Sequence, residues 1–443
     1  MPKIAFYTLG CKSNQYETDL MKEKCLSADL KEAPFREKAD IYVINTCTVT
    51  SVADKKSRHA IRLARRQNPD ALIIATGCYT EVSPKEVANI SEVDVILPNS
   101  EKKNILKHLK IQNPLRQCSG QAKSKIQNKF QFPNPNLSTR VRANLMIEDG
   151  CEHFCNYCIV PYARGKVKSK PIGNIIKESE ELVARGAKEI ILTGINLGAY
   201  GLDARRKTKY DSHFAAAKRN TLPNVIKALS EIDGLYRIRL SSLEPMFITK
   251  KLIDTIADTP KVCPHLHIPL QSGDNKVLKA MRRNYTAAKY LKLLNYIKKK
   301  IKNAAINTDI IVGFPGEGKK EFNNTIKLVN KAKFSRMHVF SYSKRIGTPA
   351  GKLEAPDPKI AHERSVKLLE LRRKHMRSYA KKWLGKKVEV LVEQRDKITR
   401  MLDGLTPHYI RVFFEGEDEL IGKIAPVKIK KIDNEFAIGS LAS

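Results

Sequence analysis

The sequence predicts an α/β protein with three parts: an amino-terminal domain built on a parallel sheet, a central partial barrel of six βα units and a small carboxyl-terminal β-barrel. Apolar runs alternate with helical stretches near the amino terminus, and a second alternating series follows a stretch of basic residues. Such alternation is typical of parallel sheets with crossover helices. The last segment instead has short β-like runs separated by glycines, which indicates a small barrel.

The amino-terminal domain is expected to cover residues 1–110. Its expected strands are 3–9, 40–45, 71–76 and 93–97, and its expected helices are 17–28, 52–66 and 103–110. The carboxyl ends of parallel strands open on one edge of the sheet, where ligands usually bind. Cys11, Cys47 and Cys78 follow three of these strands, in TLGCKSN, INTCTVT and ATGCYTE. The three thiols should therefore converge.

A basic linker is expected at 111–138, because ten Lys or Arg and no Asp or Glu lie between Lys102 and Ile147. The partial barrel is assigned to 139–382, with strands at 142–147, 189–193, 236–240, 265–269, 306–312 and 337–341. A basic amphipathic helix at 362–382 closes this part. In such folds the chemistry lies on loops at the strands' carboxyl ends.

The last part, 383–443, has β-like runs at 387–394, 409–414 and 421–430, with Gly404, Gly416 and Gly422 expected at turns. This pattern resembles small β-barrels that bind nucleic acid. Ten Lys or Arg balance ten Asp or Glu from Trp383 to Ser443. If this part binds RNA, the binding must come from local basic patches or be shared with the linker and the basic helix.

The composition excludes a disordered chain and indicates a polyanionic partner. The 443 residues are 42% hydrophobic, and 81 Lys+Arg against 46 Asp+Glu give a net charge of +35. Basic residues concentrate between Asn275 and Thr308 and at Arg205, Arg206, Lys207 and Lys209. These stretches fit phosphate binding, although a lysine-rich bias that solvates helix faces is the alternative. The amino terminus lacks a secretory signal and no apolar run reaches the ~18 residues of a membrane helix, so we expect a soluble cytoplasmic protein without membrane contact.

Cys151, Cys155 and Cys158 form a C-x3-C-x2-C motif in the first loop of the barrel. Three cysteines can hold three corners of a 4Fe-4S cube and leave the fourth iron open for reaction. A structural zinc site would need four closed ligands, and His153, which lies between the cysteines, is poorly placed to be the fourth. The motif therefore indicates a cluster. The amino-terminal cysteines match no local motif, and each alone could be a buried structural thiol, but their equivalent strand-end positions favour a second cluster. No function is assigned to Cys25, Cys118 or Cys263.

Strand-end residues of the barrel are candidate cofactor contacts. LTGIN, with Gly194 and Asn196, ends the second strand, and VGFPGE, with Gly313 and Gly316, ends the fifth. Glycine permits close approach of backbone to a ligand, although an ordinary βα connection explains any one of them equally well. The other polar strand-end residues that could reach a cofactor or substrate are Ser241, Glu244, Gln271 and Asp309.

These motifs together identify the chain as similar to the radical S-adenosylmethionine methylthiotransferases. The resemblance rests on TLGCKSNQYETD, NTCTVT and TGCY, followed by GCEHFCNYCIVPYARG, LTGINLGAYG, SSLEP, HLHIPLQSG, MRRNYT, TDIIVGFPGE and FSYSKRIGTPA. NTCTVT and PYARG most resemble the branch that modifies N6-threonylcarbamoyladenosine beside the tRNA anticodon, and the last segment resembles that family's TRAM domain.

The resemblance implies an enzyme with two 4Fe-4S clusters. The cluster on Cys151, Cys155 and Cys158 would bind S-adenosylmethionine and generate a 5′-deoxyadenosyl radical that activates the adenine C2 position. The cluster on Cys11, Cys47 and Cys78 would supply or carry sulfur, and a second S-adenosylmethionine would donate the methyl group. Such an enzyme would need tRNA, an electron donor protein and a sulfur source. The alternatives are a methylthiotransferase for a ribosomal protein aspartate and an RNA-binding iron-sulfur electron carrier.

Overall fold

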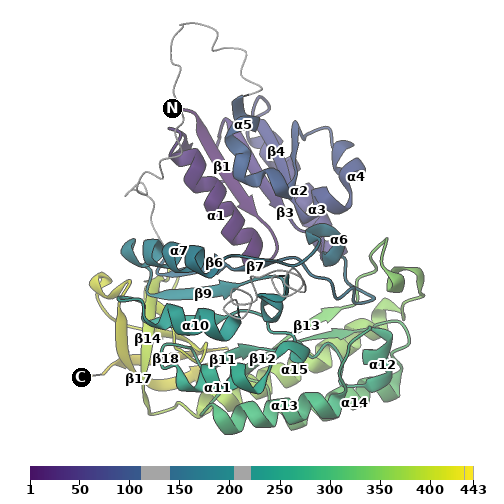
Figure 1. The fold of residues 1–443 in the computed structure, drawn as a ribbon, viewed down its shortest axis with the longest axis vertical. Helices are drawn as coiled ribbons and strands as arrows, with labels where there is room; N and C mark the ends of the chain where they lie inside the picture. The colour runs from purple at the N-terminus through teal and green to yellow at the C-terminus, as the bar shows by residue number, and fades with distance from the viewer. Residues whose placement is uncertain (111–139, 204–220, 434, 443) are drawn as a thin grey trace, which may run out of the picture. The chain divides into compact units, whose positions relative to one another are not determined.

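The computed structural model describes residues 1–110, 140–203, 221–433 and 435–442. The expected linker at 111–138, Cys118 and the basic cluster at 205–209 lie outside these residues. The chain divides into two compact units, one of Met1–Ser138 with Tyr162–Arg164 and one of Thr139–Pro161 with Gly165–Ser443 (Figure 1). In the described part of the chain, no helix is long and apolar enough to cross a membrane.

The first unit contains the parallel sheet that the sequence predicts. The strand order is β2-β1-β3-β4-β5, and every pair is parallel. The strands are β1 (Lys3–Thr8), β2 (Lys31–Glu32), β3 (Ile41–Thr46), β4 (Leu72–Gly77) and β5 (Val95–Leu97). The helices are α1 (Lys12–Leu26), α2 (Ser51–Gln67), α3 (Cys78–Val82), α4 (Pro84–Ala88), the 3-10 helix η1 (Asn99–Asn104) and α5 (Ile105–Lys110).

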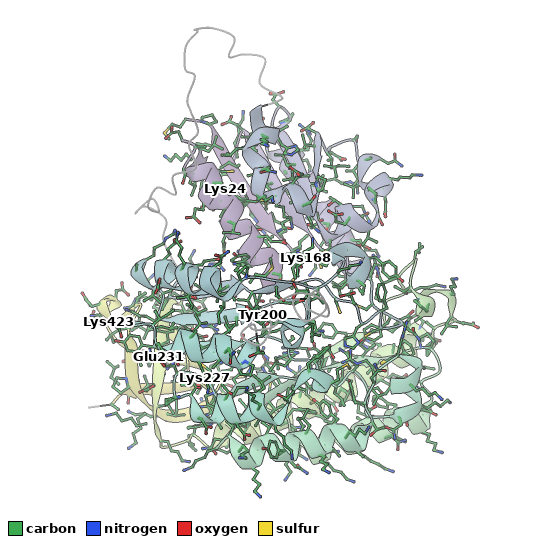
Figure 2. The ribbon with its side chains drawn as sticks, in the orientation of Figure 1. Lys24, Lys168, Tyr200, Lys227, Glu231 and Lys423 are labelled. Atoms are coloured by element: carbon green, nitrogen blue, oxygen red, sulfur yellow. The ribbon has the colours of Figure 1, made fainter. Side chains whose placement is uncertain are left out.

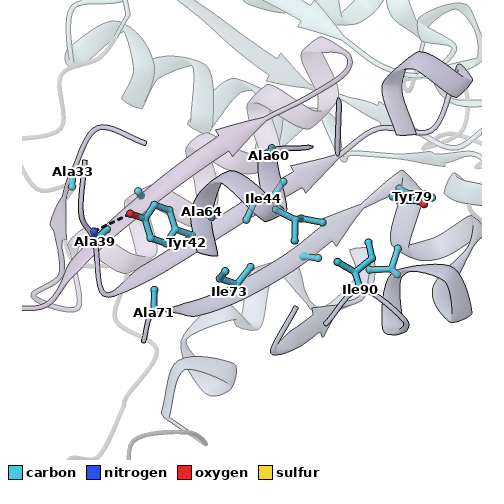
Figure 3. Packing of buried hydrophobic residues seen from close by; sticks show 14 residues of the cluster. Ala33, Ala39, Tyr42, Ile44, Ala60, Ala64, Ala71, Ile73, Tyr79 and Ile90 are labelled. Atoms are coloured by element: carbon cyan, nitrogen blue, oxygen red, sulfur yellow. Dashed lines mark hydrogen bonds between the residues drawn. The ribbon is translucent and has the colours of Figure 1, made fainter. Parts of the chain in front are cut away.

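Both faces of this sheet are covered, which explains why its central strands are continuous apolar runs. On one face, α2 packs Ala60, Ile61 and Ala64 against Ile44 and Ile73 of the sheet (Figure 3). The Tyr42 hydroxyl at the edge of this core accepts a hydrogen bond from the Ala39 N–H at 3.0 Å and donates one to the Glu37 carbonyl at 2.6 Å. The opposite face packs against α1 and α5.

The second unit begins with the six parallel strands of the expected partial barrel. They form two three-stranded sheets, β10-β9-β6 and β11-β12-β13, joined by single bridges such as Ser242 with His267. The strands are β6 (Arg142–Met146), β9 (Glu189–Thr193), β10 (Arg237–Leu240), β11 (His265–His267), β12 (Ala305–Val312) and β13 (Arg336–Ser341).

Helices follow the barrel strands, as the alternation predicts, and α13 and α14 lie outside β12 in Figure 1. The main helices are α7 (Ile172–Ala184), α10 (Leu222–Ser230), α11 (Lys250–Asp258), α13 (Ala287–Lys300) and α14 (Lys319–Ala332). The shorter elements are β7 (Glu148–Asp149), α6 (Val160–Arg164), β8 (Lys168–Ser169), η3 (Leu197–Ala199), η4 (Pro245–Phe247), α12 (Asn275–Ala280) and η5 (Pro349–Lys352).

The basic helix α15 (Pro358–Lys381) leads into a closed barrel of order β14-β15-β16-β18-β17. Its elements are β14 (Lys387–Arg395), β15 (Leu402–Leu405), β16 (Arg411–Phe414), η6 (Asp418–Leu420), β17 (Ile424–Asp433) and β18 (Phe436–Leu441). The expectation that Gly404 lies at a turn is wrong, because it lies inside β15. A Cβ at Gly404 would meet the Leu391 carbonyl oxygen at 2.4 Å, so the glycine permits close strand pairing.

The small barrel contacts the amino-terminal end of the larger one. The Tyr409 ring stacks on His265 of β11 at 4.4 Å between centroids. The same ring lies under the guanidinium groups of Arg239 (5.0 Å) and Arg142 (5.8 Å). Both arginines bind Glu189, Arg239 at 2.6 Å and Arg142 at 2.9 Å. These five residues are here called the barrel floor: four come from both sheets of the larger barrel, and Tyr409 comes from the small barrel between β15 and β16.

Basic side chains are spread over both units. Lys24 lies on α1, Lys168 on β8, Lys227 on α10 and Lys423 just before β17, and all four are exposed (Figure 2). Glu231, at the end of α10, is exposed as well, whereas the buried Tyr200 hydroxyl donates to the Lys170 carbonyl at 2.7 Å. Exposed lysines therefore lie on helices, on a strand and in a connection between strands.

Candidate cluster and cofactor sites

Cys151, Cys155 and Cys158, here called the loop trio, lie directly after β7 on a loop held by backbone contacts. The Cys151 N–H donates to the Gly165 carbonyl at 3.0 Å, and the Cys158 N–H donates to the Cys155 carbonyl at 2.9 Å. Asn156 fixes the middle of the loop, because its N–H and side-chain amide donate to the carbonyls of Met281 (3.2 Å) and Ala280 (2.7 Å). The thiols are thus positioned by neighbouring barrel loops.

The surroundings of the loop trio fit a cluster better than a zinc ion. Burial, with a smaller contribution from neighbouring thiols, raises the pKa of Cys151 to about 11 and of Cys158 to about 12. Such thiols need a bound metal cation to become thiolates. A zinc ion with Zn–S bonds of about 2.3 Å would hold its sulfurs within about 4.6 Å of one another. In the described part of the chain, the three sulfurs do not all lie within 4.8 Å of one another.

Arg283 is a site residue that the sequence analysis did not select. Its Nη1 atom lies 3.5 Å from the Cys155 sulfur, and its other nitrogen forms an ion pair with Glu244. Arg283 is 6% exposed, so the ion pair compensates a buried charge. Glu244, which follows β10, therefore positions a cation beside Cys155.

Asn196, a predicted cofactor contact, lies beside a buried carboxyl group. Its N–H donates to the Glu148 Oε2 atom at 2.7 Å. A Cβ at Gly194 would lie 2.6 Å from the same oxygen, so that glycine makes room for the carboxyl group. Burial raises the pKa of Glu148 to about 8. Within the described residues, Glu148 Oε1 and Asn196 Oδ1 are buried without a hydrogen-bond partner, which fits a ligand with N–H donors such as the amino group of S-adenosylmethionine.

The other predicted glycines have different surroundings. Gly313 has a φ of +71°, and a Cβ there would approach the Ala361 Cβ to 2.7 Å, so helix packing accounts for it. Gly316 has a φ of +83°, and no atom lies within 4 Å of the position that a Cβ would take there, which leaves its backbone open. Gln271 is buried and has a φ of +63°. Their role as cofactor contacts stays a prediction.

Cys11, Cys47 and Cys78, here called the edge trio, meet at the carboxyl edge of the sheet in the first unit. Cys11 precedes α1, Cys47 follows β3, and Cys78 begins α3 directly after β4. A Cβ at Gly10, whose φ is +100°, would lie 3.1 Å from the Cys47 sulfur. Burial raises the pKa of Cys47 to about 11, and the nearby Cys78 and Cys11 add to it. The expected convergence of the three thiols is therefore seen.

A buried ion cluster lies beside the edge trio within the first unit. Lys102 is 5% exposed, and its ammonium group lies 2.5 Å from Glu17 and 3.1 Å from the Asn45 side-chain oxygen. Burial raises the pKa of Cys78, while the charges of Arg164 and Lys102 oppose that effect. Sequence analysis missed these cations because a lysine in a basic stretch gives no signal of burial.

Three family models match the chain in its amino-to-carboxyl order. Residues 3–98 match "Uncharacterized protein family UPF0004", residues 146–329 match the radical SAM superfamily, where SAM is S-adenosylmethionine, and residues 381–442 match the TRAM domain.

Curated relatives extend the similarity over nearly the whole chain. Threonylcarbamoyladenosine tRNA methylthiotransferase MtaB of Bacillus subtilis is 40% identical, over 97% of this chain and 94% of the relative. The protein of the same name from Aquifex aeolicus is 37% identical, over 96% and 100%. The tRNA-2-methylthio-N(6)-dimethylallyladenosine synthase of Clostridium tetani is 34% identical, over 96% and 93%.

Solved structures share the fold. The radical S-adenosylmethionine methyltransferase TsrM from Kitasatospora setae, solved with cobalamin and a [4Fe-4S] cluster, is 14% identical and gives a TM-score of 0.55. The match covers 79% of this chain and 77% of that chain. At this identity the likeness supports the fold alone.

Proposed function

Because the chain belongs to the radical S-adenosylmethionine tRNA methylthiotransferases, we propose that it converts N6-threonylcarbamoyladenosine next to the tRNA anticodon to its 2-methylthio derivative. The observation that carries the proposal is similarity along nearly the whole chain, 33–40% identity, to three relatives named for threonylcarbamoyladenosine. The relatives named for dimethylallyladenosine are 32–34% identical.

The reaction explains why the chain needs its two cysteine trios. A purine C2 position carries a strong C–H bond without an acidic proton, so a general base or simple nucleophile does not functionalise it at neutral pH. When bound, the 4Fe-4S clusters and S-adenosylmethionine supply the one-electron, sulfur and methyl chemistry that is required. In our proposal the loop trio and the edge trio each hold one cluster. Arg283 donates to Cys155, and Glu148 with Asn196 accepts from the cofactor.

We propose that the anticodon arm of tRNA meets basic faces of the described residues. One face belongs to α2, where Lys55, His59, Arg62 and Arg66 line a groove of about 630 Å³ with Arg58 and Arg65. Phosphate contacts supply most sequence-independent affinity for nucleic acid. The proposed enzyme is cytoplasmic and also needs an electron donor protein and a sulfur source. The domain limits at 110, 138 and 382 stay a prediction.

Nucleoside mass spectrometry of tRNA from cells with and without this protein tests the proposal. We expect cells without the protein to accumulate N6-threonylcarbamoyladenosine and to lose its 2-methylthio form. Expression of the wild-type chain should restore the modified nucleoside, while a Cys151→Ala chain should not. An unchanged nucleoside profile with a methylthio mass lost from a ribosomal protein would support the alternative substrate. An unchanged nucleoside profile together with an unchanged ribosomal protein mass would favour an electron carrier.

A further inference from the structure

Two histidines and an aspartate lie together inside the larger barrel and belong to neither cysteine trio. His267 of β11 approaches Asp309 of β12 at 3.0 Å, and His338 of β13 approaches the other Asp309 oxygen at 3.1 Å. The histidine rings lie 5.5 Å apart. The side chains are 15%, 22% and 39% exposed for His267, Asp309 and His338 respectively. The group is therefore partly accessible to a ligand.

The position of this group follows from the barrel floor. Alternate residues of a strand point to the same face, at a spacing of ~6.6 Å. His265 points into the barrel, because it stacks on Tyr409 together with arginines from the other sheet. His267 is two residues further along β11. Asp309 contacts both His267 and His338. The three side chains therefore form the next interior layer, toward the carboxyl ends of the strands.

Two further polar residues follow barrel-floor residues of the opposite sheet by the same two-residue spacing. Asn144 lies two residues after Arg142, and Ser241 lies two residues after Arg239. Ser241 is 9% exposed. Within the described residues, its hydroxyl oxygen and the Asn144 side-chain oxygen are buried without a hydrogen-bond partner. A buried polar atom without a partner is costly, so these atoms indicate a polar ligand in the barrel.

We propose that this polar ring, formed by Asn144, Ser241, His267, Asp309 and His338, binds the N6 threonylcarbamoyl group of the substrate adenosine. The inference rests on the proposed function and names the residues that select the substrate. The threonylcarbamoyl group carries ureido N–H donors, a hydroxyl and a carboxylate. Asp309 and the Asn144 side-chain oxygen accept from N–H or O–H, and the histidines and the serine donate to the carboxylate and carbonyl oxygens.

The relatives named for threonylcarbamoyladenosine and for dimethylallyladenosine differ in the N6 group that the polar ring would contact. A dimethylallyl group has no hydrogen-bonding atom, so it would cover the ring and leave the Asn144 and Ser241 side-chain oxygens unpaired. Sites built to hydrogen-bond a substrate group discriminate strongly against analogues without that group, because the buried polar atoms of the site lose their partners. The polar ring therefore favours the threonylcarbamoyl group over the dimethylallyl group.

The test uses reconstituted full-length protein and three anticodon stem-loops that differ only at N6: threonylcarbamoyl, dimethylallyl and unsubstituted adenosine. Dissociation constants and methylthiolation are measured for wild type, His338→Phe and Asp309→Asn. His362→Phe is the matched control, because His362 is exposed on α15. Wild type should bind the threonylcarbamoyl arm at least about tenfold more tightly than the dimethylallyl arm. His338→Phe and Asp309→Asn should remove most of that preference, while His362→Phe should keep it.

The outcomes separate the two proposals. If wild type does not methylthiolate the threonylcarbamoyl arm, the proposed function fails. If wild type methylthiolates the threonylcarbamoyl arm and both variants still prefer that arm to the dimethylallyl arm, the polar ring is not the subsite. Retained iron content in Asp309→Asn excludes misfolding as the cause of a lost preference. A divalent metal that wild type binds and Asp309→Asn loses, with the RNA preference unchanged, would make the group a metal site and overturn the inference.

Discussion

At the scale of single residues, the contact between Arg283 and Cys155 gives a prediction for the cluster that the loop trio would hold. A guanidinium N–H that donates to a ligand sulfur stabilises the reduced, more negative cluster. Arg283→Met should therefore lower the reduction potential, by on the order of 50 mV if the loss corresponds to about a tenfold change for one electron. Potentiometric titration followed by electron paramagnetic resonance measures the shift.

Arg282→Met is the matched control for this measurement, because Arg282 is the exposed neighbour of Arg283. It should leave the potential unchanged. Since Arg283→Met also leaves Glu244 without its partner, Glu244→Gln shows how much of the shift comes from that carboxylate. Equal potentials in wild type and Arg283→Met would show that the 3.5 Å contact does not tune the cluster.

Sequence analysis located the cysteines but missed Arg283 and Glu148, which lie near them or near a predicted cofactor contact. The loop trio is local, and the edge trio follows from the equivalence of strand ends in a parallel sheet. Arg283 lies 128 positions from Cys155, and Glu148 lies 48 positions from Asn196. Such pairs depend on which strands become neighbours and on burial. The periodicity of the sequence does not encode either property.

At the scale of elements, α2 carries a basic face that can be tested separately from the sheet it covers. Its apolar side packs Ala60, Ile61 and Ala64 into the core, while Lys55, Arg62 and Arg66 are exposed. Replacing these three cations by Gln should weaken tRNA binding with little effect on stability. The slope of log K against log salt should fall by about one for each phosphate that the variant no longer neutralises.

Lys24→Gln, Lys227→Gln and Lys289→Gln combined remove the same charge from exposed positions elsewhere and serve as the control. Fluorescence anisotropy with an anticodon stem-loop at several salt concentrations compares the two triple variants. Equal slopes for both would mean that α2 is an ordinary solvated helix and that only the total charge matters.

The elements that sequence analysis missed are short or carry mixed signals. The six barrel strands were found because each is an apolar run before a helix. Strand β2 has two exposed residues, Lys31 and Glu32, and therefore no burial pattern. Strand β15 has the sequence LDGL, whose glycine suggested a turn. Its place is set by pairing with β14 and β16, which is a tertiary effect.

At the scale of the whole molecule, the barrel floor connects the two barrels of the second unit and predicts how its stability depends on pH. Burial tends to raise the pKa of Glu189, but the charges of Arg239 and Arg142 outweigh it and lower the pKa to about 2. A carboxyl group with a lowered pKa stabilises the fold above its ordinary value near 4.5 and loses that contribution as the pH falls toward 2. Glu189→Gln should cost about 3–5 kcal/mol near neutral pH, because Arg239 and Arg142 lose the carboxylate that they share.

Denaturant unfolding of wild type and Glu189→Gln at several pH values checks this, with the difference expected to shrink below pH 4.5. Glu231→Gln is the control, since Glu231 is exposed at the end of α10, and it should change stability by less than about 0.5 kcal/mol. A difference between wild type and Glu189→Gln that is constant from neutral pH to the lowest pH would show that the charge of Glu189 is not what matters.

The division of the chain into two units predicts that its two clusters assemble independently. The edge trio is held by strand ends of the first unit, and the loop trio is held by barrel loops of the second. Anaerobically reconstituted wild-type protein should contain about eight irons, four for each cube. Replacing either trio by alanine should leave about four irons, because the backbone that positions the other trio is unchanged.

The two triple variants should nevertheless differ in chemistry. Without the loop trio, cleavage of S-adenosylmethionine should be lost. Without the edge trio, cleavage to 5′-deoxyadenosine should persist while methylthiolation stops, because sulfur delivery is then the missing step. Iron analysis and chromatography of the cleavage products measure both effects. Wild-type protein that holds only about four irons after full reconstitution would show that the edge trio is a set of buried structural thiols, since three strand-end cysteines alone do not require a cluster.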